Sequence, residues 1–303
     1  MPTILDRIKT LLADRAATSE TPASAAAPAV PRADGIRTVS TRIGGKTYRL
    51  TSDDDYLNHV QGEFEPDMVR LFDALLSRNH VAFDVGANIG CTTLLFGDLC
   101  QAVYSFEPSP STFVYLQQNV EASRQQNVTL ANLGLGRESG NFELTFAKNN
   151  RSGGFVSNLT QASQGHQIES IRIHKGDDWV RAQDIARIDF IKIDVEGFEQ
   201  HVLEGLAETL QRDRPVVVLE LNHWCLNVFQ RTSVPDFLDF LRGIFPHLYA
   251  VEAGDVRNLH DPNAAYHVMY HHLVNGMKYA NLVGAFDRSQ LARFSQEFDI
   301  QVD

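Results

Sequence analysis

The chain alternates short, mostly apolar runs with segments of helical periodicity, and this alternation constrains its fold more than any other feature. Runs of this kind are typical of strands that are buried on both faces. Strands that alternate with helices imply βαβ units and a mainly parallel sheet. We therefore predict an α/β fold with helices on both faces of the sheet. The predicted strands are Val81–Val85, Ala102–Phe106, Val128–Leu133, Phe190–Ile193, Val216–Leu221, Leu248–Val251 and Asn281–Phe286.

The N-terminal region differs in composition from the rest of the chain. Residues 1–15 place apolar side chains at helical spacing, which predicts a short amphipathic helix. We expect this helix to pack on its own domain or on a second subunit, with docking to a membrane surface or a partner as the alternative. Residues 16–35 are rich in Ala, Pro, Ser and Thr and offer little to bury, so we predict a disordered linker. Residues 36–303 should then form the globular domain.

Two regions of this domain depart from the alternation. Arg37–Leu50 alternates apolar and polar residues around Gly44-Gly45, which predicts a hairpin, and Glu65–Arg78 has helical periodicity. Asn141–Ile173 contains two apolar runs separated by a loop rich in Gly and Ser. We predict that this region is a small β insertion near the substrate.

Charge and cysteine content narrow the class of protein. The net charge of −11 argues against a nucleic-acid partner, because such proteins usually present a basic face. No apolar run approaches the ~20 residues of a transmembrane helix. Cys91, Cys100 and Cys225 fit no zinc spacing and follow no signal peptide, so we expect reduced cysteines in a cytoplasmic protein. A homo-oligomer is compatible with these features.

The segment after the first predicted strand indicates a nucleotide-type cofactor. Gly86 permits a tight turn and Gly90 lets the backbone approach a ligand, at the strand end where open α/β sheets bind ligands. Asn88 replaces the middle glycine of the dinucleotide motif G-x-G-x-x-G. Asp84 would repel a phosphate but can hold an ammonium group. Glu107 ends the next strand, where an acidic residue can accept hydrogen bonds from ribose hydroxyls. These features favour S-adenosylmethionine (SAM) over a dinucleotide.

A second acidic segment follows another buried strand. Asp194 ends that strand, and Glu196 lies near the start of the next helix. Lys192 lies within the strand, and we expect it to pair with Asp194 and Glu196 because buried lysines are rarely unpaired. Glu220 ends the following strand. Since neighbouring parallel strands end at one edge of the sheet, Asp194 and Glu220 should face the same cleft as the glycine loop.

The motifs DVGANIG, FEP, KIDVEGFE and RPVVVLEL, in this order, resemble the FkbM family of methyltransferases over roughly Ala82–Leu221. The resemblance implies a Rossmann-like class I methyltransferase fold, with a seven-stranded sheet whose last strand is antiparallel. It also implies SAM-dependent O-methylation, often of sugars or natural products. It places the cofactor at the glycine loop and Glu107, and Asp194 at the methyl-transfer cleft. The third strand ends in Ala131-Asn-Leu-Gly-Leu-Gly136, where the family more often has an alanine-leucine-glycine run, and Asn132 or Leu133 is the candidate adenine contact.

Methyl transfer to a hydroxyl requires an aligned acceptor and is helped by a general base. The candidate bases, in order, are Asp194, His223 and Glu196. Asp194, Glu220 and Asn222 also offer the hard oxygen ligands that a divalent metal prefers. Carboxylates at strand ends serve equally as acceptors for hydroxyl-rich substrates, so we favour a metal-independent enzyme and keep a divalent metal as the alternative.

Two other functions are compatible with parts of this pattern. An NAD(P)-dependent oxidoreductase is disfavoured by Asp84 and Asn88. A catalytically silent binding module of the same fold could dock through the N-terminal helix and linker, but the retained motifs favour an enzyme. The acceptor, a small molecule or a glycan, is not evident from the motifs. We expect its recognition to lie in the Asn141–Ile173 insertion and in the loops after Trp224.

Overall fold

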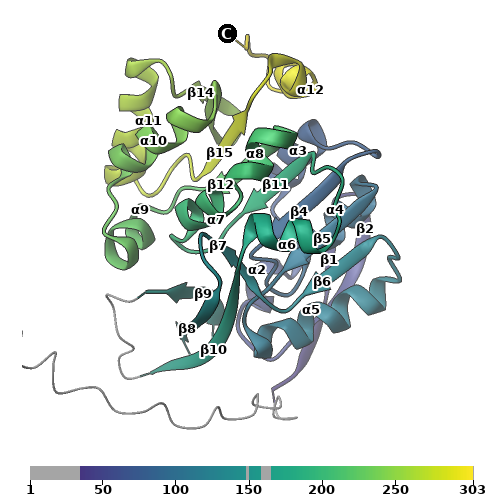
Figure 1. Ribbon diagram of the computed structural model, residues 1–303. Helices are drawn as coiled ribbons and strands as arrows, with labels where there is room; N and C mark the ends of the chain where they lie inside the picture. Colours follow the sequence, from purple (N-terminus) through teal and green to yellow (C-terminus); the bar gives the residue numbers. More distant parts are fainter. Residues whose placement is uncertain (1–34, 148–149, 158–164, 303) are drawn as a thin grey trace, which may run out of the picture.

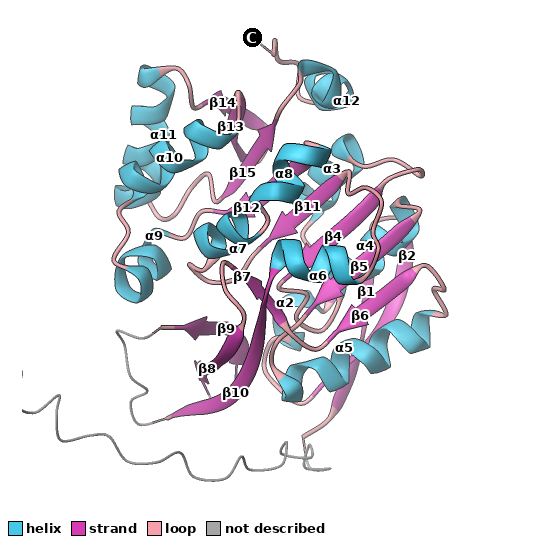
Figure 2. Cartoon of the chain, viewed as in Figure 1, coloured by secondary structure: helices cyan, strands magenta, loops and turns pink. Residues whose placement is uncertain are grey.

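An eight-stranded sheet forms the centre of the computed structural model, which describes residues 35–147, 150–157 and 165–302 (Figures 1 and 2). The strand order is β14-β13-β15-β12-β11-β4-β5-β6. The five strands from β12 to β6 are parallel, and β15 is antiparallel to both neighbours. The bounds are β4 (Val81–Val85), β5 (Ala102–Phe106), β6 (Val128–Ala131), β11 (Phe190–Ile193), β12 (Val216–Glu220), β13 (His247–Glu252), β14 (Asp255–Asn258) and β15 (Asn281–Ala285).

This sheet confirms the predicted fold class but corrects the strand count from seven to eight. The seven predicted runs all form strands, and the last of them, β15, is the antiparallel one. The additional strand, β14, pairs with β13 through a two-residue turn in which Ala253 and Gly254 have φ of 44° and 91°. Its sequence, Asp-Val-Arg-Asn, has a single apolar residue, so it offers no apolar run. Ala-Gly also differs from the Asn-Gly pair usual in such turns.

Side chains of the central strands alternate between two cores on opposite faces of the sheet. Along β12, Val216 and Val218 lie in one core, while Val217 and Leu219 lie in the other. The prediction of helices on both faces is therefore confirmed. The first core is covered by α3 (Pro66–Leu75), α4 (Cys91–Leu99), α5 (Pro110–Ser123) and α12 (Ala292–Glu297), and the second by α6 (Gly176–Ala182), α7 (Glu199–Gly205), α8 (Ala207–Asp213), α10 (Val234–Ile244) and α11 (Pro262–Val274).

Two smaller sheets complete the described part of the chain. The hairpin predicted around Gly44-Gly45 is confirmed, and the predicted helix at Glu65–Arg78 is confirmed as α3. A four-stranded sheet of order β7-β10-β8-β9 contains the predicted insertion and lies at the lower left of Figure 2. The bounds are β1 (Arg37–Ile43), β2 (Lys46–Ser52), β3 (Gly62–Glu63), β7 (Gly134–Gly136), β8 (Gly140–Ala147), β9 (Asn150–Val156) and β10 (His166–Lys175), with short helices α2 (Leu57–Val60), α9 (His223–Cys225), η1 (Leu226–Gln230) and η2 (Arg288–Leu291).

Three further expectations concern the N-terminal segment, membrane-spanning helices and the cysteines. The predicted N-terminal helix and nearly all of the predicted linker lie outside the described residues. Within the described ranges, no helix combines the length and apolarity needed to cross a bilayer. Cys91, Cys100 and Cys225 are buried and free, in agreement with the expectation of unpaired cysteines.

Candidate active site

A cavity of about 290 Å³ lies where β4, β5, β11 and β12 end. This volume is near the lower limit of roughly 300–1,000 Å³ for ligand pockets. The carboxyl ends of parallel strands meet at one edge, and the loops that follow them form one side of the cavity. Residues of the four-stranded sheet and of the segment between β2 and α3 form the rest of its wall.

The glycine loop forms part of the wall through its backbone. Gly86 has φ of +85°, and a Cβ atom there would lie 1.8 Å from the carbonyl oxygen of Asp194. The site thus requires glycine at this position, because the loop packs directly on the turn that carries Asp194. Asn88 also lines the cavity and has φ of 50°. Gly90 does not line it: it precedes α4 with φ of +100°, and its missing side chain makes room for Leu116 of α5.

Glu107 lies at the end of β5 and lines the cavity beside the glycine loop. Its two carboxylate oxygens accept hydrogen bonds from the backbone N–H groups of Asn88 and Ser109, both at 2.9 Å. Burial raises the pKa of Glu107 to about 7, although these two hydrogen bonds oppose the shift. Asn132 is not among the residues that line the cavity. Its amide donates to the carbonyl oxygens of Glu107 and Pro108, so it fixes the turn after β5.

Asp84 lies behind the cavity wall and is fully buried. It accepts a hydrogen bond of 2.6 Å from the Thr93 hydroxyl, and its other oxygen lies 3.5 Å from the Lys192 ammonium. The same ammonium lies 3.3 Å from Asp194 and donates to the carbonyl oxygen of Gly86. Burial alone would lower the pKa of Lys192, but the two carboxylates raise it above its usual value. The sequence predicts that Asp84 holds an ammonium group of the ligand. In the structure, the ammonium group beside Asp84 is that of Lys192.

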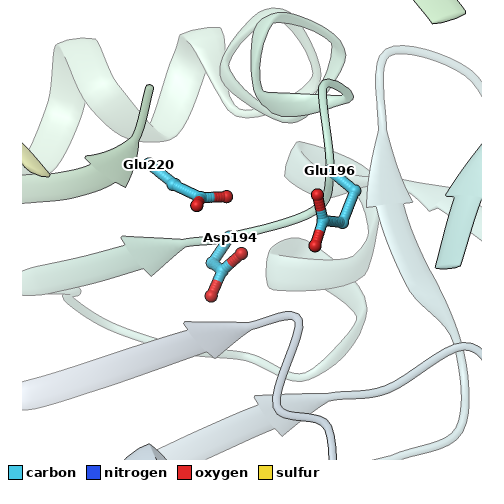
Figure 3. A group of neighbouring side chains, drawn as sticks. All are labelled: Asp194, Glu196 and Glu220. Carbon is cyan, nitrogen blue, oxygen red and sulfur yellow. The ribbon is translucent and has the colours of Figure 1, made fainter. Parts of the chain in front are cut away.

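Three carboxyl groups that line the cavity converge on one another (Figure 3). Asp194, Glu196 and Glu220 each offer an oxygen, and these atoms all lie within 4.8 Å of one another. Burial and Asp194 raise the pKa of Glu196 to about 7, and the same two causes raise the pKa of Glu220. Glu196 accepts hydrogen bonds from the Asn222 amide and the Cys225 thiol, so the expected pairing of Lys192 with Glu196 is wrong. The group could hold several hydroxyl donors or one divalent cation.

The structure brings together some of the predicted site residues and separates others. Asp194, Glu196 and Glu220 line one cavity with the glycine loop, as the parallel strand ends predicted. His223 is not among the lining residues: its backbone N–H donates to His272, and its ring packs edge-on against the His272 ring. None of the described residues beyond Glu220 lines this cavity, so the loops after Trp224 contribute nothing to its described wall.

Among the lining residues that sequence reasoning missed, three have polar or charged side chains of particular interest: Tyr56, Glu65 and Arg151. Tyr56 and Glu65 come from the segment between β2 and α3, and Arg151 comes from β9. Glu65 has φ of 27°, a conformation that a residue with a side chain rarely adopts and that tends to occur at functional sites. For these three residues, the sequence offered one signal, the prediction that the Asn141–Ile173 insertion lies near the substrate. That insertion contains Arg151 but neither Tyr56 nor Glu65.

The fold and the site together define a class I methyltransferase, with a glycine loop and an acidic residue on consecutive strand ends. A model described as the Methyltransferase FkbM domain matches residues 84–256, which is more than half of the chain. The chain therefore belongs to the FkbM methyltransferase family, and the predicted resemblance is confirmed.

Two curated relatives each match about half of the chain or slightly less. The hexuronic acid methyltransferase AglP of Haloferax volcanii is 29% identical over 154 residues, covering 51% of this chain and 61% of AglP. Methyltransferase 1 of Beauveria bassiana is 30% identical over 145 residues, covering 41% of this chain and 57% of the relative. The chain thus spans about three fifths of the length of these relatives.

Similar solved structures include a methyltransferase FkbM from Methylobacillus flagellatus KT, with 18% identity and a TM-score of 0.39 over 57% of this chain and 39% of the other. SMU.1697c of Streptococcus mutans, solved with S-adenosylhomocysteine (SAH), has 12% identity and a TM-score of 0.38 over 62% and 88% of the two chains.

Proposed function

We propose that this protein is a SAM-dependent O-methyltransferase that methylates a hydroxyl of a sugar, glycolipid or natural product. The observation that carries the proposal is that one cavity of an FkbM family member is lined by the glycine loop, by Glu107 and by three converging carboxyl groups. The name of AglP, a hexuronic acid methyltransferase, supports an acceptor related to sugars. The free cysteines support our placement of the enzyme in the cytoplasm.

The residues of the cavity fit SAM. Each oxygen of Glu107 accepts one backbone hydrogen bond, and an ionised carboxylate has about four acceptor positions, so two remain for ribose hydroxyls. The cavity is rich in carboxylates, which suits a ligand whose sulfonium and ammonium groups outnumber its carboxylate. The close packing of Gly86 on Asp194 joins the cofactor side of the cavity to the carboxylate side.

Asp194 is the residue best placed to receive the proton of an acceptor hydroxyl. Bound SAM supplies an electrophilic methyl group, and the chain must align a hydroxyl with it and accept a proton. The side chain of Asp194 is 44% exposed and lines the cavity, while Lys192 holds one of its oxygens in place. Glu196 is engaged by Asn222 and Cys225, and His223 lies away from the cavity. The structure thus favours Asp194 over the other two candidate bases.

The test is transfer of a labelled methyl group from SAM to a panel of sugar and natural-product hydroxyls. We expect a product whose label survives mild alkali, since a methyl ether is stable there and a methyl ester is hydrolysed. A labelled product that loses its methyl group in alkali would show carboxyl methylation. Protein that binds SAM but labels nothing in the panel would favour the silent binding module.

Glu107 predicts that SAM affinity depends on pH. Its pKa in the free protein is raised to about 7 by burial, and only the ionised form is a full acceptor for ribose hydroxyls. Apparent affinity scales with the ionised fraction, so it should rise about tenfold between about pH 6 and about pH 8. Calorimetric titration across this range measures the effect. Glu107→Gln should bind more weakly with a flat profile, and an equal slope in that variant would exclude Glu107 as the cause.

A further inference from the structure

We infer that the acceptor is an uncharged polyhydroxyl compound, of the hexopyranoside class, and that the site discriminates against acceptors that carry a carboxylate or phosphate group. The inference rests on the proposed function and deepens it, because it assigns the charge class of the acceptor. It follows from the carboxylates of the cavity, the pairing of its cations and the apolar wall beside them.

The carboxylate side of the cavity offers acceptors and few donors. Asp194, Glu196 and Glu220 present oxygens within 4.8 Å of one another, and Glu65 lines the same cavity. The partners of Glu196 are the neutral amide of Asn222 and a thiol. One oxygen of Glu220 is buried and accepts no hydrogen bond from the described residues. Burial and Asp194 raise the pKa of Glu196 to about 7 and the pKa of Glu220 to about 10, so near neutral pH Glu220 keeps its proton and Glu196 is partly ionised. The ionised groups accept hydrogen bonds from ligand hydroxyls, and the repulsion that raises these pKa values also opposes the addition of an anion.

The cations that line the described wall already have anionic partners. Lys192 lies between Asp84 and Asp194, at 3.5 and 3.3 Å. Arg151 donates two hydrogen bonds to Asp53 and lies 3.6 Å from Asp54, and its side chain is largely buried. An anionic acceptor would find neither cation free and would lie beside Asp194 and the partly ionised Glu196. Like charges placed together in this way cost several kcal/mol, which corresponds to a loss of affinity of roughly 100-fold.

An apolar wall from the four-stranded sheet completes the cavity. Leu144 and Val156 come from β8 and β9, and Ile171 and Ile173 come from β10. A pyranose ring has hydroxyls at its edge and C–H groups on its faces, so it can place hydroxyls on the carboxylates and a face against these side chains. A uronate has the same ring but adds a charge. The inference therefore separates this chain from its relative AglP, which is named for hexuronic acid.

The experiment compares matched neutral and acidic sugars on the whole protein. Methyl α-D-glucopyranoside is titrated against methyl α-D-glucopyranosiduronate, with the galacto and manno pairs alongside, by calorimetry with and without saturating SAH and in a chelator. We expect at least one neutral glycoside to bind and its uronate to bind roughly 100-fold more weakly. Equal or tighter uronate binding overturns the inference, as does the absence of binding by every neutral glycoside. Failure to bind SAH contradicts the proposed function instead, so the two failures are distinguishable.

A charge-removing variant tests the cause of the discrimination. Glu196→Gln/Glu220→Gln keeps the side-chain shapes and removes both groups that can add negative charge beside Asp194, so the preference for the neutral sugar should fall at least tenfold relative to the wild type. Asp239→Asn, an exposed carboxylate on α10, is the matched control and should leave the preference unchanged. An unchanged preference in the double variant overturns the inference. So does tight uronate binding on addition of Mg²⁺, because a metal ion would then bridge the carboxylates and the acid.

Discussion

Lys192→Met is expected to lower the free energy of unfolding by about 3–5 kcal/mol, the usual cost of removing one partner from a buried ion pair. The substitution leaves Asp84 fully buried with a hydrogen bond from Thr93 but no cation beside it. Met has a similar length and adds no new charge, so the loss reports the missing ammonium group. Urea unfolding of the two proteins measures the difference.

Two further variants isolate the cause of this loss. Asp84→Asn/Lys192→Met removes both charges and should recover much of the lost stability. Lys46→Met removes an exposed lysine that pairs with Asp98, and should cost no more than about 1 kcal/mol. If Lys192→Met lowered the free energy of unfolding no more than Lys46→Met does, the buried pair of Asp84 and Lys192 would not stabilise the fold as we expect.

Asp194→Asn is expected to reduce kcat by roughly 10²–10⁴-fold, the range that general bases contribute. The amide cannot accept the hydroxyl proton, while Lys192 keeps its ion pair with Asp84 and the wall stays intact. The affinity for SAH should therefore change by less than about tenfold. Turnover with the best acceptor and calorimetric titration with SAH separate the two effects.

His223→Gln is the informative comparison for this prediction. Because His223 does not line the cavity, the variant should lose less than about tenfold in kcat. A larger loss in His223→Gln than in Asp194→Asn would move the role of base to His223. A parallel loss of SAH affinity in Asp194→Asn would show that Asp194 acts on the cofactor rather than on the acceptor.

The central sheet could be predicted because its strands are buried on both faces and therefore differ in composition from the helices between them. The shared position of Asp194 and Glu220 followed from the same fact, since neighbouring parallel strands end at one edge. Strand β14 could not be predicted in this way, because it is an edge strand with polar residues. Its existence depends on the turn at Ala253 and Gly254 rather than on burial.

The sequence predicted which backbone segments meet at the cavity, but it did not predict the direction in which each side chain points. Gly86 and Glu107 line the cavity as expected, but the side chain of Asp84 points into the protein and pairs with Lys192. Tyr56 and Arg151 reach the cavity from regions far from the motifs in sequence, and only the tertiary fold brings them there. Local sequence patterns do not indicate which distant residues the tertiary fold brings to the cavity.

Calorimetric titration with SAM and SAH tests the central claim most directly, on the wild type, Gly86→Ala and Gly243→Ala. Gly86→Ala would place a Cβ atom 1.8 Å from the Asp194 carbonyl oxygen at a φ of +85°, so the wall of the cavity must move. Gly243 is an exposed helical glycine with open space around its Cβ position, and serves as the matched control. We predict micromolar binding of both ligands by the wild type and by Gly243→Ala, and none by folded Gly86→Ala. Folded wild-type protein that binds neither ligand would contradict the assignment of this cavity to SAM.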